Sequence, residues 1–275
     1  MPSSATSEKM HGDAPLTQRD DGPQMSDFVQ SLERGISVIR SFSADNPRQT
    51  LADVSRQTGL TRATARRLLL TLEHLGYVRS DGRYFELTAR ILDIGYSYIS
   101  SLNLNDIAQP YLERFSEEVH ESSSVSVLDD TDIVYVARVP TKRIMTVSIG
   151  LGSQFPAYQT SMGRVLLAEL PDDEIVDIFE RSDRSHATER TVDSAAELLD
   201  CIGTVRAQGW ALLDQELEIG VRSIAAPLRN SAGTAIAAMN VSTHAGRTDL
   251  DQITEVFLPR LLETAEQITA ALAMR

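Results

Sequence analysis

Cysteine is almost absent from this 275-residue sequence, which contains only Cys201. A single cysteine forms no intrachain disulfide, and it builds no structural zinc site without several histidine partners. The chain has no apolar run of about 18 residues, the length that a transmembrane helix needs. Its first residues, 1–5, lack the basic and then apolar pattern of a secretory signal. We therefore expect a cytoplasmic protein of two domains, with no membrane partner, no metal and no cofactor.

Positive charge is scarce overall, because 26 Lys and Arg face 39 Asp and Glu and the formal net charge is −13. Between Met25 and Arg90, however, Arg outnumbers Asp plus Glu by about three, which leaves about −16 for the rest of the chain. A locally basic segment can bind phosphates while an acidic remainder limits indiscriminate adhesion. A DNA-packaging protein is usually basic throughout, so this class is not favoured.

Sequence motifs for catalysis are also missing. The chain has neither a Gly-x-Ser-x-Gly motif nor a phosphate-binding glycine loop, and its histidines have no metal-ligand spacing. The one enzyme-like feature is the alternation of Asp214, Glu216 and Glu218, which would face one side of a strand. We expect these acids to pair with arginines or to face solvent. A metabolite-processing enzyme with this acidic site is the alternative function.

The N-terminal third combines a polar arm with a compact pattern of helices. Residues 1–24 have few large apolar side chains and are predicted to be a disordered arm. Residues 25–87 show three helical patterns, with Thr50 and Thr61 as caps of the second and third helices. An Asp-Gly pair at 81–82 then separates two short apolar segments, which is a hairpin signal. Three helices and a hairpin predict a winged helix-turn-helix.

The third helix, "TRATARRLLLTLEHLG", has the two faces of a DNA-reading helix. Its apolar stripe, which we expect to face the core, consists of Ala65, Leu68, Leu69, Leu72 and Leu75. Arginine on the other side can make bidentate contacts to guanine, and threonine can touch a base edge. Arginines beside the hairpin turn can reach phosphates. The candidate DNA-binding residues are Thr50, Thr61, Arg62, Thr64, Arg66, Arg67, Arg79 and Arg83.

The rest of the chain changes to a mixed pattern. Residues 88–101 are predicted to be a linker helix, and 102–275 a second domain. Period-two alternation predicts strands at 123–130, 132–139, 144–150, 210–216, 222–229 and 234–242. Helical patterns cover 105–120, 160–170, 172–181, 195–207 and a final helix from about Asp249. Hairpin connections predict an antiparallel sheet, so the fold class is α+β.

Two segments resemble the IclR family of bacterial regulators. "LERGISVIRSFSADNPRQTLADVSRQTGLTRATARRLLLTLEHLGYVRSDGRYFELTARILDIG" resembles its DNA-binding domain, and "GWALLDQELEIGVRSIAAPLRNSAGTAIAAMNVS" its sensor signature. The signature is matched at Gly209, Glu216, Ser223, Ile224, Ala225, Leu228 and Asn230. It is not matched at Leu213, where an acidic residue or Ser is usual, or at Arg229, where an aromatic residue or His is usual.

The resemblance implies a GAF-like α/β sensor domain that binds a small effector, and a homodimer or tetramer that binds double-stranded operator DNA. The string "DQELEIGVRSIAAPLRN" is most similar to the Pca and Pob regulators of aromatic-acid breakdown. This similarity implies a small organic-acid effector such as protocatechuate, 4-hydroxybenzoate or β-ketoadipate.

An acidic effector needs hydrogen-bond donors and a cation in a protected pocket. In "GLGSQFPAYQTSMGR", three glycines permit close approach of the backbone, the start of a helix offers free amides, and Tyr158 is suited to stack on a ring. Strand alternation puts Arg222 and Ser223 on opposite faces. The candidate effector-binding residues are Gly150, Gly152, Tyr158, Ser161, Met162, Gly163, Asp214, Glu216, Arg222, Ser223, Asn240 and Ser242. Arg138 and Arg143 are further candidate cations.

Overall fold

The computed structural model describes residues 28–43, 45–94, 104–141, 149–185 and 188–274. Outside these residues lie the predicted disordered arm, half of the predicted linker helix, most of the predicted strand 144–150, and Arg143. The chain separates into two compact units, 1–94 and 95–275, here called the N-terminal and C-terminal domains. The boundaries predicted at residues 24, 87 and 101 stay predictions. Among the described residues, no helix is both long and apolar enough to cross a membrane.

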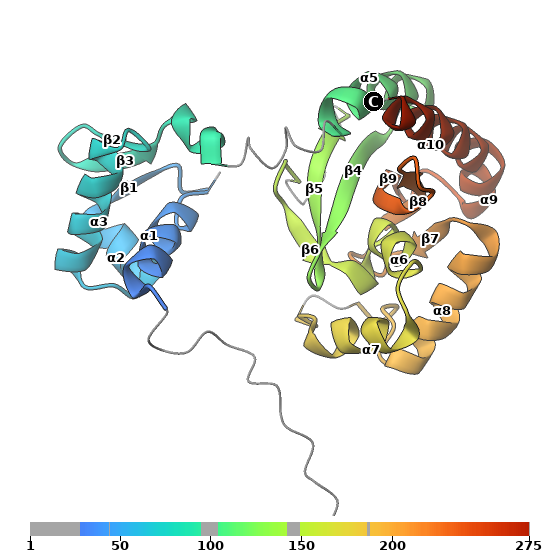
Figure 1. Cartoon of the computed structure of the whole chain (residues 1–275), viewed down its shortest axis with the longest axis horizontal. Helices are drawn as coiled ribbons and strands as arrows, with labels where there is room; N and C mark the ends of the chain where they lie inside the picture. Colours follow the sequence, from blue (N-terminus) through green and yellow to red (C-terminus); the bar gives the residue numbers. More distant parts are fainter. Residues whose placement is uncertain (1–27, 44, 95–103, 142–148, 186–187, 275) are drawn as a thin grey trace, which may run out of the picture. The chain divides into compact units, whose positions relative to one another are not determined.

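The N-terminal domain is a winged helix-turn-helix, as predicted (Figure 1). Its small antiparallel sheet has the order β1-β3-β2. Its core is formed by Val38, Val54, Ala65, Leu69, Leu72 and Val78. The elements are α1 (Gln30–Arg40), β1 (Arg48–Thr50), α2 (Leu51–Thr58), α3 (Arg62–His74), β2 (Val78–Ser80) and β3 (Tyr84–Leu87), followed by the short helix η1 (Ala89–Ile91).

Two threonine caps fix the starts of the helix pair. The Thr50 hydroxyl accepts from the Asp53 amide while the Asp53 carboxylate accepts from the Thr50 amide, which is a capping box. The Thr61 hydroxyl accepts from the Thr64 amide at the start of α3. Strand β1 was not predicted, because only three residues pair with β3 before α2 begins. Leu75, predicted to face the core, is instead 48% exposed because it caps the end of α3.

The C-terminal domain is built on an antiparallel sheet with the strand order β6-β5-β4-β9-β8-β7. The predicted α+β class is therefore confirmed. Its strands are β4 (Ser122–Asp129), β5 (Asp132–Val139), β6 (Gln154–Pro156), β7 (Ala211–Asp214), β8 (Val221–Arg229) and β9 (Ala235–His244). Its helices are α5 (Leu104–Val119), η2 (Ala157–Gln159), α6 (Ser161–Leu167), α7 (Asp172–Arg181), α8 (Ala195–Gln208), α9 (Leu250–Gln252), the π-helical turn η3 (Ile253–Phe257) and α10 (Leu258–Ala273).

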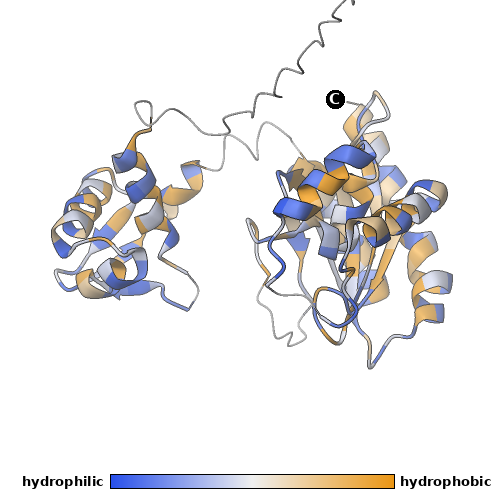
Figure 2. Ribbon diagram, turned by 90° about the horizontal axis from the view of Figure 1, so that it is seen from below, coloured by the Kyte–Doolittle hydropathy of each residue, from blue (hydrophilic) through white to orange (hydrophobic). Residues whose placement is uncertain are grey.

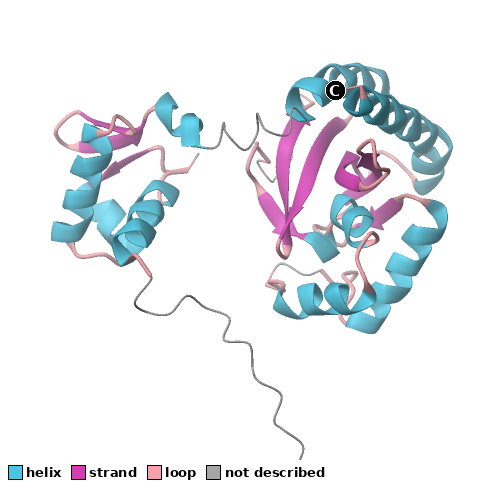
Figure 3. Ribbon diagram, in the orientation of Figure 1, coloured by secondary structure: helices cyan, strands magenta, loops and turns pink. Residues whose placement is uncertain are grey.

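Helices cover both faces of this sheet (Figures 1 and 3). On one face α5 and α10 pack against alternate strand residues such as Val125, Ile224 and Val241. On the other face α6, α7 and α8 pack against residues such as Ile133 and Ala225. Most of the helices carry hydrophilic and hydrophobic residues in alternating bands (Figure 2), as expected of helices that each bury one side. The sheet is therefore buried on both sides, and polar residues on it need hydrogen-bond partners.

A glycine in α6 sets how closely this helix approaches the preceding turn. A Cβ atom on Gly163 would lie 2.0 Å from the carbonyl oxygen of Ala157. Real Cβ atoms essentially never come that close, so only glycine fits without a shift of the backbone. Gly203 in α8 is a matched contrast, because a Cβ there would meet nothing within 4 Å.

We predict that Gly163→Ala destabilises the C-terminal domain by about 3 kcal/mol, because α6 must move away from Ala157. Gly203→Ala is the control and should be neutral or stabilising by up to about 1 kcal/mol, since alanine favours helix more than glycine. Urea unfolding followed by circular dichroism measures both changes. Equal stability of the two variants would contradict the packing role of Gly163.

Candidate functional site

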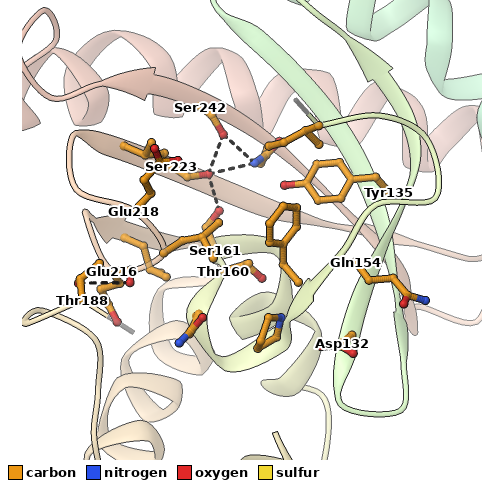
Figure 4. Close-up of a pocket in the computed structure, with 18 of the residues that line it drawn as sticks. Asp132, Tyr135, Gln154, Thr160, Ser161, Thr188, Glu216, Glu218, Ser223 and Ser242 are labelled. Atoms are coloured by element: carbon orange, nitrogen blue, oxygen red, sulfur yellow. Dashed lines mark hydrogen bonds between the residues drawn. The ribbon is translucent and has the colours of Figure 1, made fainter. Parts of the chain in front are cut away.

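The C-terminal domain contains a cavity of about 810 Å³ on the face of the sheet that carries α6 (Figure 4). Its apolar wall consists of Ile149, Phe155, Pro156, Leu213, Leu217, Ile219 and Val221. Its polar lining consists of Asp132, Tyr135, Gln154, Gln159, Thr160, Ser161, Asp183, Thr188, Glu216, Glu218, Ser223, Asn240 and Ser242. A cavity of this size with an apolar wall and a few convergent polar groups is typical of a small-molecule site.

Four of the lining residues form a connected group of hydroxyls and one amide (Figure 4). The Ser161 and Ser223 hydroxyl oxygens are 2.7 Å apart. Asn240 Nδ2 donates to Ser223 Oγ at 3.0 Å and to Ser242 Oγ at 3.1 Å. Ser242 Oγ also donates to Ser223 Oγ at 3.3 Å. We call these four residues the hydroxyl cluster; Ser223 is its centre because it contacts the other three.

Strand register explains why this cluster forms. Ser223 of β8 is opposite Ser242 of β9, and Asn240 lies two residues before Ser242 on the same face. Ser161, at the start of α6, contacts Ser223 from the helix that covers this face of the sheet. The Thr160 hydroxyl caps this helix by accepting from the Gly163 amide. Residues from three separate elements thus point polar groups into one space.

Two amide side chains in the cavity lining retain unpaired buried atoms. Asn240 Oδ1 and Gln159 Oε1 are buried and have no hydrogen-bond partner among the described residues. An unpaired buried polar atom costs about 1–3 kcal/mol, so such atoms usually indicate a bound water or ligand. The cavity therefore offers unmet hydrogen-bonding capacity to a polar ligand.

Tyr135 of β5 adds a phenol to the polar lining. Its hydroxyl points toward the hydroxyl cluster in Figure 4. Burial raises the pKa of Tyr135 to about 12, although the nearby Arg138 guanidinium opposes this shift. The phenol is therefore neutral at physiological pH and can donate a hydrogen bond. The alternation of "DIVYVARV" predicted this strand, but nothing in it identified Tyr135 as a site residue.

The three acids suspected of forming an enzyme-like site do not lie on one strand face, and that expectation is wrong. Strand β7 ends at Asp214, and the chain then turns at Gln215, whose φ is 66°. Asp214 is paired with Arg222 and Arg190, and it does not line the cavity. Among the described residues no group of three or more potential metal ligands is present.

Glu216 lines the cavity but is already engaged in an ion pair. Its carboxylate pairs with Arg164, and both side chains are almost fully buried. Arg164 Nε also donates to the Tyr158 carbonyl at 3.0 Å, and this hydrogen bond fixes the position of the guanidinium. Burial raises the pKa of Glu216, and Arg164 counteracts that shift. The pair holds the turn after β7 against α6.

The structure places five of the twelve predicted effector residues on the cavity: Ser161, Glu216, Ser223, Asn240 and Ser242. Tyr158 is instead buried in the core, where its ring meets Phe179 edge-on at 5.0 Å. The two glycines before β6 form a turn, with Gly152 at φ 79°. The other predicted residues outside the lining are Met162, Gly163, Asp214 and Arg222.

Two of these residues have clear structural roles. Gly163 faces Ala157, so the close approach that it allows is to its own chain. Arg222 Nε donates to Asp214 at 2.6 Å, and Arg222 Nη1 donates to the Thr248 carbonyl at 2.7 Å. The pair forms because Asp214 is directly opposite Arg222 in the β7–β8 ladder. Arg222 and Ser223 face opposite sides, as strand alternation predicts.

In the N-terminal domain, the arginines of α3 lie on its exposed side. Arg62, Arg66 and Arg67 are all exposed, and none of them has an ion-pair partner within the described ranges. The Thr64 hydroxyl is 3.0 Å from the Thr61 hydroxyl, so both are engaged in the helix cap. The outward face of α3 is therefore basic and free to meet a polyanion.

The wing carries arginines on either side of its turn. Arg79 pairs with Glu86 of the adjacent strand at 2.7 Å. The Arg83 and Arg48 guanidinium groups both lie 5.1 Å from the centre of the Tyr84 ring. Arg48 was not among the predicted residues because strand β1, which brings it to the wing, was not predicted.

Two family models match the chain. The model of the C-terminal domain of the bacterial transcriptional regulator IclR matches residues 96–270, and the IclR helix-turn-helix model matches residues 31–82. The Pca regulon regulatory protein of Pseudomonas putida is 43% identical over 243 residues, which cover 88% of this chain and 84% of that protein.

Solved structures of transcriptional regulators also match this chain. The crystal structure of a transcriptional regulator from Rhodococcus sp. RHA1 is 56% identical, with a TM-score of 0.79, and the match covers 89% of this chain and 98% of that one. The inducer-binding domain of the PobR transcription factor from Acinetobacter, a double mutant in complex with 3-hydroxybenzoic acid, is 30% identical. Its TM-score is 0.56, and the match covers 60% of this chain and 97% of that one.

A winged helix with a basic reading helix, followed by an α/β domain with a polar cavity, is the architecture of a ligand-responsive transcriptional regulator. The chain belongs to the IclR family of bacterial transcriptional regulators. The resemblance to the Pca and Pob regulators is confirmed.

The raised pKa of Tyr135 predicts a loss of stability at alkaline pH. The folded protein favours the neutral phenol, so this contribution is complete below pH 10 and is lost as the pH rises from 10 to about 12. A shift of this size corresponds to about 3 kcal/mol. Tyr135→Phe should therefore lose less stability than the wild type between pH 10 and about 12, as measured by urea unfolding across that pH range. Tyr111→Phe on α5, outside the cavity, is the control; if it behaves like Tyr135→Phe, the assignment is wrong.

Proposed function

We propose that this protein binds operator DNA sequence-specifically through α3 and the wing, and that a small aromatic acid in the C-terminal cavity changes that binding. The observation that carries the proposal is the cavity itself, where an apolar wall faces the hydroxyl cluster. An aromatic ring can pack against the apolar wall, and its carboxyl or hydroxyl substituents can hydrogen-bond to the hydroxyl cluster. The related PobR domain, which binds 3-hydroxybenzoic acid, supports the same ligand class. More broadly, we propose that the effector is a metabolite of the β-ketoadipate pathway.

The proposed DNA interface is the exposed face of α3, with Arg62, Arg66 and Arg67 toward the major groove. Arg79 and Arg83 on the wing would contact phosphates. Thr50 acts through the cap of α2, and Thr61 and Thr64 act through the cap of α3, since their hydroxyls are already engaged. These roles would place the protein in the cytoplasm, where the DNA is.

We further propose that the protein works as a homodimer, with a tetramer as the larger possible assembly. One face of α1 exposes Leu32 and Ile36, which are 64% and 45% exposed, and Phe28 just before the helix is 51% exposed. Such a row of exposed apolar residues supports a contact with a second copy. Two winged helices would then bind two half-sites about one helical turn apart.

Regulation requires that the effector bind the DNA-competent and DNA-incompetent states with different affinity. By linkage, DNA binding then changes effector affinity by the same factor. Isothermal titration of the effector into free and operator-bound protein measures this factor directly. Equal affinities in the two states would exclude a regulatory role for the cavity.

We predict that Arg66→Ala and Arg67→Ala each weaken operator binding by about 1–3 kcal/mol if they contact guanine. Fluorescence anisotropy of a labelled promoter fragment from the protein's own genomic neighbourhood, at fixed salt, measures this loss. Effector binding should be unchanged, because these residues belong to the other domain. Arg40→Ala, at the exposed end of α1, is the control. Undiminished operator affinity in both α3 variants would place the groove-facing side elsewhere.

We predict that Ser223→Ala weakens effector binding about 5- to 30-fold, because it removes the centre of the hydroxyl cluster. Arg222→Ala, at the next position of the same strand, should leave effector affinity unchanged while lowering stability by about 1–3 kcal/mol, since Asp214 loses a partner. Isothermal titration with 4-hydroxybenzoate and urea unfolding separate the two effects. The reverse pattern would mean that β8 faces the ligand with its other side.

A further inference from the structure

The cavity poses an electrostatic problem for the proposed effector, because a carboxylate needs a cation or several donors when it is buried. The charged residues among the described lining are all acidic: Asp132, Asp183, Glu216 and Glu218. The two arginines nearest to the hydroxyl cluster in sequence are occupied. Arg164 is paired with Glu216, and Arg222 is paired with Asp214. Among the described lining residues no cation is available to such a carboxylate, so a positive charge would come from a residue beside the lining.

Arg138 of β5 is such a residue. It is half-buried, and no ion pair joins it to a carboxylate in the part of the chain that the structure describes. Its Nη1 donates to Ser124 Oγ at 3.0 Å. Its Nε is buried and has no hydrogen-bond partner among the described residues. A guanidinium with an unsatisfied buried N–H is costly, and a bound anion would relieve that cost.

Strand register places Arg138 on the cavity side of the sheet. Arg138 is opposite Ser124 of β4, and Ser124 is opposite Asn240 of β9. Residues opposite one another in a sheet share a face, and adjacent strands are about 4.8 Å apart. The guanidinium reaches Ser124, whose neighbour on the next strand is Asn240, a residue that lines the cavity.

Tyr135 provides the second link between Arg138 and the cavity. The two residues are three apart on β5, and the Arg138 charge opposes the rise that burial causes in the pKa of Tyr135. That phenol lines the cavity and points to the hydroxyl cluster (Figure 4). The Arg138 guanidinium thus lies beside the part of the lining that contains Tyr135 and Asn240.

We propose that Arg138 binds the carboxylate of the effector and makes the site select an acid over its neutral ester or amide. This inference rests on the proposed function, since it assigns one end of the same ligand. Arginine suits the role because its planar fork donates two parallel hydrogen bonds to a carboxylate. The aromatic ring then lies along the apolar wall, and its hydroxyl groups point away from Arg138.

The test measures the affinity of the full-length protein for three acids and their amides. Isothermal titration uses 3-hydroxybenzoate, 4-hydroxybenzoate and 3,4-dihydroxybenzoate, each against its carboxamide. In the wild type we expect the acids to bind more tightly than the amides. Arg138→Gln should weaken acid binding about 10- to 100-fold and leave amide binding unchanged. Arg138→Lys should give an intermediate ratio of acid to amide affinity, because it keeps the charge but loses the fork.

Arg260→Gln on α10 is the charge-matched control and should bind every compound as the wild type does, since Arg260 pairs with Glu118 outside the cavity. Thermal unfolding shows whether each variant is folded. If Arg138→Gln does not fold, Arg138→Lys decides, and an unchanged ratio of acid to amide affinity overturns the proposal.

Three results overturn the assignment, and they are distinguishable. If the wild type binds none of the three acids, the proposed aromatic-acid effector fails and the role of Arg138 fails with it. If the wild type binds an acid and Arg138→Gln binds it equally well, only the role of Arg138 fails. If Arg138→Gln loses acid and amide to the same extent, Arg138 supports the shape of the site and does not recognise the carboxylate.

Discussion

The feature on which the C-terminal domain depends is a row of polar residues on a sheet that helices bury on both sides. Along β9, Ala237, Met239 and Val241 face the α5–α10 layer, while Asn240 and Ser242 face α6. Strand β4 follows the same rule, and its Ser124 and Ser126 are buried on the α6 side. Polar groups on a covered sheet destabilise the fold unless they are hydrogen-bonded. The domain satisfies part of this requirement with the hydroxyl cluster, while Asn240 Oδ1 has no hydrogen-bond partner among the described residues.

The sequence allowed the fold to be predicted where one physical signal dominated. The capping threonines, the Asp-Gly turn and the apolar stripe of α3 predicted the winged helix, because each of these signals is local. Strands β1 and β6 were missed because each has only three residues and depends on its partner strand for pairing. Leu75 followed the stripe of α3 in spacing, yet it lies at the end of the helix, where solvent is accessible.

The site was less predictable than the fold, for a geometric reason. Ser223, Asn240 and Ser242 could be proposed because the resemblance to the IclR family favours these positions. Tyr158 and Met162 do not line the cavity and are buried, because spacing along the chain does not tell which side of η2 and α6 faces the core. Tyr135 was missed because nothing in the sequence shows that β5 lies beside the cavity. Long-range contacts of this kind appear only once the sheet order is known.

The arginines of the two domains lie in different environments. The arginines of α3 are exposed and have no ion-pair partner among the described residues, which suits binding to a polyanion from solvent. Near the cavity, by contrast, Arg164 and Arg222 are held by carboxylates of the same domain. A ligand carboxylate cannot displace those buried partners without leaving them uncompensated, which is costly. An acid can therefore bind with least reorganisation where a guanidinium still has a free donor, and the geometry of β5, β4 and β9 puts that donor at Arg138.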